Sequence, residues 1–187
     1  MNSLVLKIFD RVRSEDERVR SRAVTDLGLI LEMYQWNLSK EARRNRYEDL
    51  LTEDIIELDL DENELTEIVE FLKGEIEKDS DLSSSMLFAM GKAPSSVGIK
   101  PLLEVVQNKL ESFDEDELYA ALSALERQLP FEDDLDFEEK RRIFSEAKIL
   151  TRISHKILSL LPILNSGLHS THSRFSACLI LLLEIDR

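Results

Sequence analysis

The strongest constraint on the fold of this chain is one spacing of apolar residues that recurs along it. Three segments have apolar residues at positions i, i+3, i+4, i+7 and i+11. Because this period places all five side chains on one side of an α-helix, each segment is predicted to form an amphipathic helix. The segments are Leu65, Ile68, Val69, Leu72 and Ile76; Ile99, Leu102, Leu103, Val106 and Leu110; and Leu118, Ala121, Leu122, Leu125 and Leu129.

Residues that favour helix ends lie between these segments. Side-chain oxygens accept the free backbone N–H groups of a first turn, so Ser, Thr, Asp and Asn often precede helices. Pro101 is expected in the first turn of the helix that follows residues 93–96, where a proline is tolerated. The candidate caps are Ser39, Asp61 or Asn63, and Ser112 or Asp114.

The predicted fold class is all-α, with nine or ten helices in a single domain over residues 1–187. The chain has only 5 Gly and 4 Pro, too few turn residues for an all-β fold. Short helices joined by short loops bury their apolar sides on their neighbours in sequence, which predicts stacked antiparallel helical hairpins. A non-repeating helical bundle is the alternative, because the same apolar pattern would build it.

One stretch of the sequence resembles the inner helices of HEAT repeats, which follow the pattern D-x-x-V-R-x-x-A-x-x-x-L-G. The matching residues are Asp16, Val19, Arg20, Ala23, Leu27 and Gly28. Two later segments repeat part of it, with Met86, Met90 and Gly91 in one and Ala121 and Leu125 in the other. The resemblance covers about residues 15–130 and implies a HEAT-like α-solenoid. Its intervals are irregular, with 63 residues from Leu27 to Met90 and 35 from Met90 to Leu125.

The negative charge of the chain is concentrated in its middle. The formal net charge is −14 overall, and residues 51–142 alone carry −17. Such a surface repels phosphate backbones and anionic lipid headgroups, so no direct binding to nucleic acid or to a membrane is expected. A basic protein, in contrast, would be attracted and its encounter accelerated. The alternative is that these acidic residues only cap helices and keep the fold soluble.

No residue pattern predicts catalysis or a cofactor. Zinc sites need three or four ligands, and His169, His172 and Cys178 have no further ligand nearby in sequence, so no metal site is expected. HEAT-like metallo-hydroxylases carry repeated His-Glu pairs, which this chain lacks, and HEAT-like DNA glycosylases present a basic surface. Acid–base catalysis needs carboxyl groups whose pKa values are driven apart, which solvated clusters do not provide. We therefore predict a protein that is not an enzyme.

A cytoplasmic location is expected. Cys178 is the single cysteine, which excludes an internal disulfide and suits a reducing compartment. The first ten residues are predicted to form an amphipathic helix and not a signal peptide. The most apolar run, residues 177–183, is far shorter than the ~20 residues that span a bilayer.

The predicted function is a non-catalytic protein-binding module that binds and neutralises a basic partner protein. Bacterial immunity proteins, which neutralise nuclease toxins, are similar in charge, size and architecture. The alternative is a HEAT-like adaptor or scaffold subunit of a larger complex. Tyr119 is predicted to be an aromatic contact beside acidic neighbours, although such a tyrosine can also close the edge of a core. The predicted partner-binding residues are Asp59, Asp61, Glu62, Asp114, Asp116, Glu117, Tyr119, Glu132, Asp133, Asp134 and Asp136.

Overall fold

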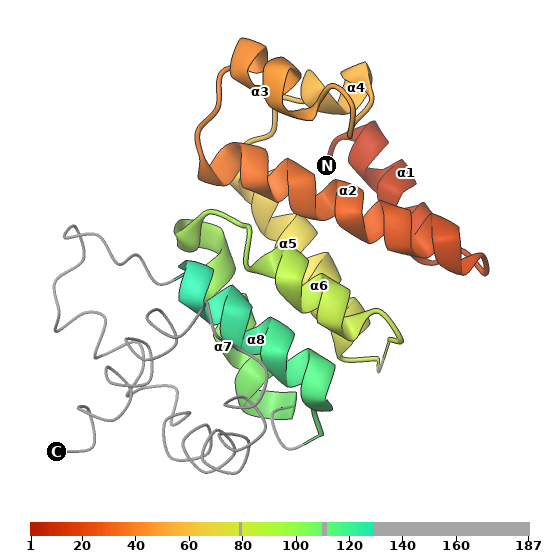
Figure 1. Ribbon diagram of the computed structural model, residues 1–187, viewed down its shortest axis with the longest axis vertical. Coiled ribbons are helices and arrows are strands. Elements are labelled where there is room, and N and C mark those ends of the chain that lie inside the picture. Colours follow the sequence, from red (N-terminus) through yellow and green to blue (C-terminus); the bar gives the residue numbers. More distant parts are fainter. Residues whose placement is uncertain (79, 110–111, 129–187) are drawn as a thin grey trace, which may run out of the picture.

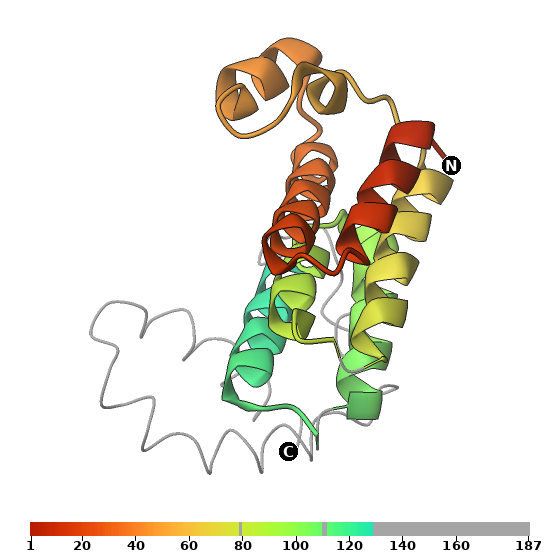
Figure 2. The ribbon, with the colours of Figure 1, turned by 90° about the vertical axis from the view of Figure 1, so that its right-hand side faces the viewer.

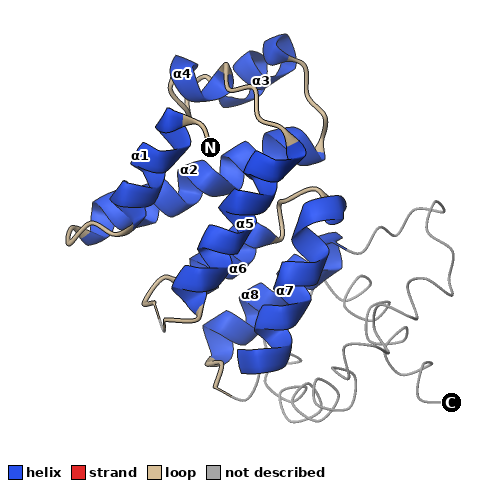
Figure 3. Cartoon of the chain, turned by 180° about the vertical axis from the view of Figure 1, so that it is seen from behind, coloured by secondary structure: helices blue, strands red, loops and turns tan. Residues whose placement is uncertain are grey.

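The computed structural model describes residues 1–78, 80–109 and 112–128 of the chain. These residues form eight helices and no strand, which confirms the all-α prediction for this part of the protein (Figure 3). The helices are α1 (Ser3–Val12), α2 (Glu17–Gln35), α3 (Lys40–Tyr47), α4 (Glu53–Ile56), α5 (Glu62–Ile76), α6 (Ser83–Met90), α7 (Ser95–Lys109) and α8 (Glu115–Gln128). None of these eight helices is long and apolar enough to cross a membrane.

Helix α5 illustrates how the sequence determines these elements. All five apolar residues of its predicted stripe are buried. Its start is closed by a reciprocal cap, in which the Asp61 carboxylate accepts a hydrogen bond from the Glu64 N–H at 2.9 Å. The Glu64 carboxylate in turn accepts from the Asp61 N–H at 3.4 Å. Of the two predicted capping residues, Asp61 is therefore the one used, and such a cap contributes roughly 1 kcal/mol.

Six of the helices form two layers (Figures 1 and 2). Helices α1, α5 and α7 lie side by side in one layer, and α2, α6 and α8 lie in the other and run in the opposite direction. The rings of Phe9 in α1 and Phe71 in α5 stack with their centroids 3.8 Å apart. Helix α6 is in the middle of its layer, in contact with both α2 and α8. The core lies between the layers, where the apolar stripes meet.

The remaining two helices, α3 and α4, form an excursion between α2 and α5 that is held by a polar clamp. The Tyr34 hydroxyl donates to the Leu58 carbonyl at 2.8 Å and accepts from the Leu60 N–H at 2.7 Å. Arg43 is only 8% exposed and donates to the carbonyls of Leu38 and Leu58 at 3.0 and 2.8 Å. Its guanidinium also lies 4.4 Å from the centre of the Tyr34 ring. This excursion accounts for the long first interval between the HEAT-like segments.

Close contact between the helices of the second layer depends on small residues. A Cβ atom at Gly91 would lie 2.5 Å from the Cα atom of Ala124 in α8. At Gly28 it would lie 3.2 Å from the Cβ atom of Ala89 in α6. Both glycines belong to the HEAT-like pattern in the sequence, and at each of them a larger side chain would press on the next helix.

The predicted position of Pro101 is wrong by one turn. Helix α7 begins at Ser95, so Pro101 lies in its second turn. The helix begins early because the Pro94 carbonyl accepts hydrogen bonds from the N–H groups of Val97 and Gly98 at 3.0 and 2.9 Å. The cost of the later position is one lost backbone hydrogen bond, since proline has no N–H group.

Candidate functional site

Two carboxylates of the acidic segment after α3, those of Glu53 and Glu57, hold α3 and α4 together. The Arg44 guanidinium lies 2.6 Å from a Glu53 carboxylate oxygen and 2.7 Å from one of Glu57. The Lys40 amine lies 3.2 Å from the other Glu57 oxygen. These carboxylates are neutralised within the chain, so the local charge of the segment is smaller than the sequence indicates.

At the start of α5, the three predicted contact residues have different roles. Asp61 caps the helix, and its capping partner Glu64 also lies 3.7 Å from the amino group of Met1. Asp59 and Glu62 are exposed, and within the described residues their side chains have no hydrogen bond or ion pair. This cluster lies at the end of the molecule near the N-terminus (Figure 2).

The start of α8 has the same type of cap. The Asp114 carboxylate accepts from the Glu117 N–H at 2.8 Å, and the Glu117 carboxylate accepts from the Asp114 N–H at 3.0 Å. Asp116 and Tyr119 remain outside this cap. Asp116 is exposed, Tyr119 is 51% exposed, and neither side chain has a hydrogen-bond or ion-pair partner among the described residues.

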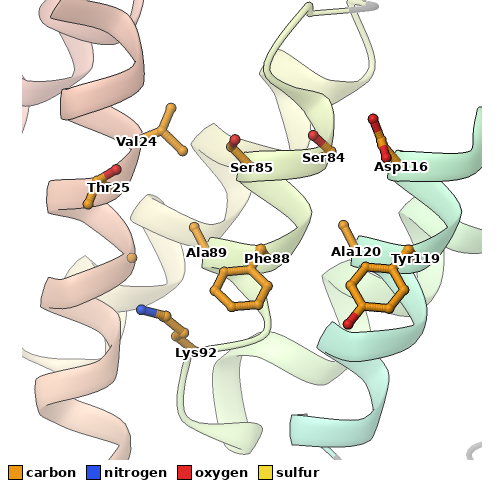
Figure 4. A pocket seen from close by; sticks show the side chains of 11 residues that line it. Val24, Thr25, Ser84, Ser85, Phe88, Ala89, Lys92, Asp116, Tyr119 and Ala120 are labelled. Carbon is orange, nitrogen blue, oxygen red and sulfur yellow. The ribbon is translucent and has the colours of Figure 1, made fainter. Parts of the chain in front are cut away.

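Asp116 and Tyr119 line a groove of about 400 Å³ that is open to solvent between α2, α6 and α8 (Figure 4). Phe88 of α6 lies beside Tyr119 in this view, and small residues form the floor. The hydroxyls of Ser84 and Ser85 have no hydrogen-bond partner among the described residues. The residues that line the groove are Val24, Thr25, Gly28, Ser84, Ser85, Phe88, Ala89, Lys92, Asp116, Tyr119 and Ala120.

The aromatic wall of the groove already interacts with cations of the chain itself. The Arg127 guanidinium lies 4.3 Å from the centre of the Phe88 ring, and the Lys92 amine lies 5.5 Å from it. Phe88 is nevertheless 38% exposed. A ring in this setting attracts cations through its negative face, an interaction worth about 0.5–1 kcal/mol at an exposed position.

The end of the groove at Lys92 is closed by a network centred on Glu32. The Glu32 carboxylate lies 2.7 Å from the Lys92 amine and 3.1 Å from the Arg46 guanidinium, and it accepts from the Tyr47 hydroxyl at 3.2 Å. Burial alone would raise the pKa of Glu32, but these donors outweigh it and hold the pKa below its usual value. Burial and the Glu32 charge raise the pKa of Tyr47 to about 12. One carboxylate and two cations meet at this end, so it is slightly positive, in contrast to the end at Asp116.

The structure thus separates the predicted partner-binding residues into groups. It brings Asp116 and Tyr119 together in the groove, and it uses Asp61, Asp114 and Glu117 as helix caps. Asp59 and Glu62 lie at the start of α5, away from the groove. The remaining predicted positions lie outside the described residues: Glu132, Asp133, Asp134 and Asp136.

Phe88, the ring beside Tyr119, was missed at the level of the sequence. Its neighbours Leu87 and Ala89 are buried, as are Met86 and Met90. Phe88 lies on the opposite side of α6, one turn from Ser84 and one turn from Lys92. Residues four apart lie on the same side of a helix, so the spacing of Ser84, Phe88 and Lys92 could have predicted that Phe88 is on the polar side of α6.

The described residues contain no group of three or more His, Cys, Asp or Glu side chains that could hold a metal ion. His169, His172 and Cys178 lie outside them. In comparisons with known proteins, the sequence matches no protein-family model, and no curated protein or solved structure matches the chain.

Proposed function

We propose that this protein is a non-catalytic binding module of HEAT-like type that recognises a basic partner protein through the groove between α2, α6 and α8. The observation that carries the proposal is the pair of Asp116 and Tyr119 at the groove edge. A carboxylate without a partner and an exposed aromatic ring are together suited to a partner that presents basic side chains.

The HEAT-like part of the proposal is supported by where the repeated residues lie. Leu27-Gly28, Met90-Gly91 and Leu125 belong to α2, α6 and α8, which form one layer. Two of these positions have a glycine that closely approaches the next helix of that layer, Gly28 at Ala89 of α6 and Gly91 at Ala124 of α8. HEAT-like proteins use such layers of parallel helices as binding surfaces.

The basic character of the partner is supported by charge. Residues 51–142 carry a net −17, and the internal ion pairs at Arg44 and Lys40 neutralise only part of it. Long-range attraction of this kind speeds encounter and is screened by salt, with a Debye length of roughly 8 Å at physiological ionic strength. Bacterial toxin immunity remains the more specific prediction, and an adaptor subunit remains its alternative. Both would use this surface, and neither requires an enzyme, a cofactor or contact with nucleic acid.

A selection of random displayed peptides on the immobilised full chain tests the proposal. We expect peptides rich in Arg and Lys to be enriched, with association slowed by added salt. Binding should fall strongly when Asp116→Lys is combined with Tyr119→Ala. The matched control is Asp59→Lys, which makes the same charge change at an exposed position away from the groove.

The proposal is wrong if no basic peptides are enriched, or if enriched peptides bind the double variant as well as the unchanged chain. Equal losses for Asp59→Lys and Asp116→Lys would show that charge acts without the groove. Reversing Asp133, Asp134 and Asp136 together tests the predicted cluster that lies outside the described residues. Circular dichroism of each variant confirms that the helices are intact.

A further inference from the structure

The groove contains more hydrogen-bond acceptors than the chain itself uses. The Asp116 carboxylate is an acceptor only, and the hydroxyls of Ser84, Ser85 and Tyr119 can each accept. Within the described residues none of these four side chains has a hydrogen-bond or ion-pair partner. The hydroxyls can also donate, but the carboxylate can only accept, so it favours a ligand that donates and is positively charged.

The Phe88 ring shows which kind of cation fits beside these acceptors. In the free protein, a guanidinium group already lies 4.3 Å from the ring centre, and it comes from Arg127 of α8. The ring keeps 38% of its surface exposed, so it is only partly covered. Arg127 is itself exposed, and within the described residues it has no carboxylate partner. In that part of the chain, moving Arg127 away from the ring breaks no ion pair.

We infer that the groove is a binding site for an arginine side chain of the basic partner, which Asp116 attracts by its charge from the groove edge and whose guanidinium replaces that of Arg127 on the Phe88 ring. The inference rests on the proposed function and names the group that is recognised. Arginine is favoured over lysine because its planar guanidinium can stack on an aromatic ring while its N–H groups point in the ring plane toward acceptors. A lysine ammonium is a compact, strongly hydrated charge that can pair with acceptors but has no planar group to stack on the ring.

Asp116 and Arg127 have opposite effects on such a ligand. Asp116 attracts it, whereas Arg127 repels it and competes with it for the ring. Removing the carboxylate should weaken binding, and removing the internal guanidinium should strengthen it. Each change is expected to be roughly two- to fivefold, the range of one exposed ion pair or cation–π contact.

The experiment is a titration of the ¹⁵N-labelled full chain, followed by NMR, with N-acetyl-arginine methylamide. The corresponding citrulline compound has almost the same shape but no charge, and the lysine compound has the charge but no planar guanidinium group. We expect the arginine compound to shift the amide signals of residues 84–92 and 115–120. The lysine compound should bind several-fold more weakly, and the citrulline compound should cause no saturable shift.

Four variants complete the test. Asp116→Asn should weaken binding of the arginine compound, and Asp59→Asn should not change it. Arg127→Ala should strengthen binding, whereas Lys100→Ala, which removes one positive charge from an exposed position in the other layer, should have no effect. The spectra themselves report whether each variant is folded.

Equal shifts by the arginine and citrulline compounds would overturn the inference, as would arginine shifts confined to residues outside the groove. It would also be overturned if Arg127→Ala weakened binding, since the ring contact would then belong to the site and not compete with it. These failures are distinct from failure of the proposed function. If basic peptides bind at the groove but the arginine compound does not, the module stands and the recognised group is different.

Discussion

Helices α5 and α8 begin with nearly the same sequence, yet the groove lined by Asp116 and Tyr119 borders only the start of α8. Both carry a reciprocal cap, between Asp61 and Glu64 in α5 and between Asp114 and Glu117 in α8. The second helical position is Asn63 in α5 and Asp116 in α8. The cap is a local device that four consecutive residues specify. The groove depends on which helices stand next to α8, and those helices are distant in the sequence.

The two helices also differ in how closely other parts of the chain pack against them. Gly74 in α5 faces open space, with no atom within 4 Å of where a Cβ would be. Gly91, which α8 covers, has no such space. The same Gly→Ala substitution at the two positions therefore compares a residue packed against α8 with a residue on the solvated side of α5. The four predictions below run from the largest expected effect to the smallest.

Replacing Gly91 by alanine should give the largest effect. Its new methyl group would meet the backbone of Ala124, and backbone cannot move aside as a flexible side chain can. Overpacking of this kind typically costs about 1–3 kcal/mol, which urea denaturation of Gly91→Ala would measure. Gly74→Ala is the control and should raise the free energy of unfolding by roughly 0.5–1 kcal/mol, because alanine favours a helix more than glycine does. If both variants were stabilised, the close contact of α6 and α8 would be wrong.

Removing the caps tests whether the two helix starts are equivalent locally. Asp61→Ala and Asp114→Ala should each lower the free energy of unfolding by about 1 kcal/mol, because each leaves backbone N–H groups of a first turn without an acceptor. Thermal or urea denaturation gives the comparison. Similar losses support purely structural roles for both residues. A loss at one start alone would contradict the symmetry of the two caps.

A change of pH should affect α5 through Glu75. Burial alone would raise the pKa of Glu75, but hydrogen bonds and charges from Lys78 and Arg13, at 2.9 and 2.8 Å, lower it from its ordinary 4.5. A lowered pKa in the folded state means that the stabilisation is present above about pH 4.5 and is lost as the pH falls through the folded-state value. Both partners are more than half exposed, so we expect less than about 1 kcal/mol.

The measurement for Glu75 is urea denaturation of the unchanged chain and of Glu75→Gln, at neutral pH and at a pH below the folded-state pKa. The difference in stability between the two chains should be present at neutral pH and vanish in acid. A difference that grew in acid would show that the sign of the shift is wrong.

The smallest effect on stability is expected for Asp116→Asn. The side chain is exposed and outside the cap, so the free energy of unfolding should change by less than about 0.5 kcal/mol. The variant also makes the second position of α8 identical to that of α5. If it lost a full kcal/mol, Asp116 would be a structural residue and its role as a free acceptor in the groove would be contradicted.

Local features of this fold follow from the sequence, and contacts between distant segments do not. The α5 stripe, the caps at Ser39, Asp61 and Asp114, and the packing glycines Gly28 and Gly91 were all predictable from residue type and spacing. Each depends on a helix period or on one turn of backbone. Tyr119 could be named as an aromatic beside acid, because its neighbours are adjacent in sequence.

The residues that line the groove with Tyr119 could not be predicted, because Phe88 reaches the same groove only when α6 packs on α8. The acidic runs gave no sign of which carboxylates would be neutralised. Arg44 pairs with Glu53 and Glu57 through the fold of α3 onto α4, while Asp116, in a similar run, pairs with no described residue. Residue type could not distinguish these cases.

The clamp of Tyr34 and Arg43 makes the α3–α4 excursion resemble a ring closed by a non-covalent staple. The Tyr34 hydroxyl is hydrogen bonded to the backbone of Leu58 and Leu60, 24 and 26 residues further along the chain. The buried Arg43 guanidinium donates to backbone carbonyls. Carbonyls carry no proton to gain and a guanidinium does not lose one, so these contacts do not depend on the ionisation of a carboxylate. The excursion therefore has an attachment to α2 that is separate from the ion pairs between α3 and α4, and it can act as its own unit of local unfolding.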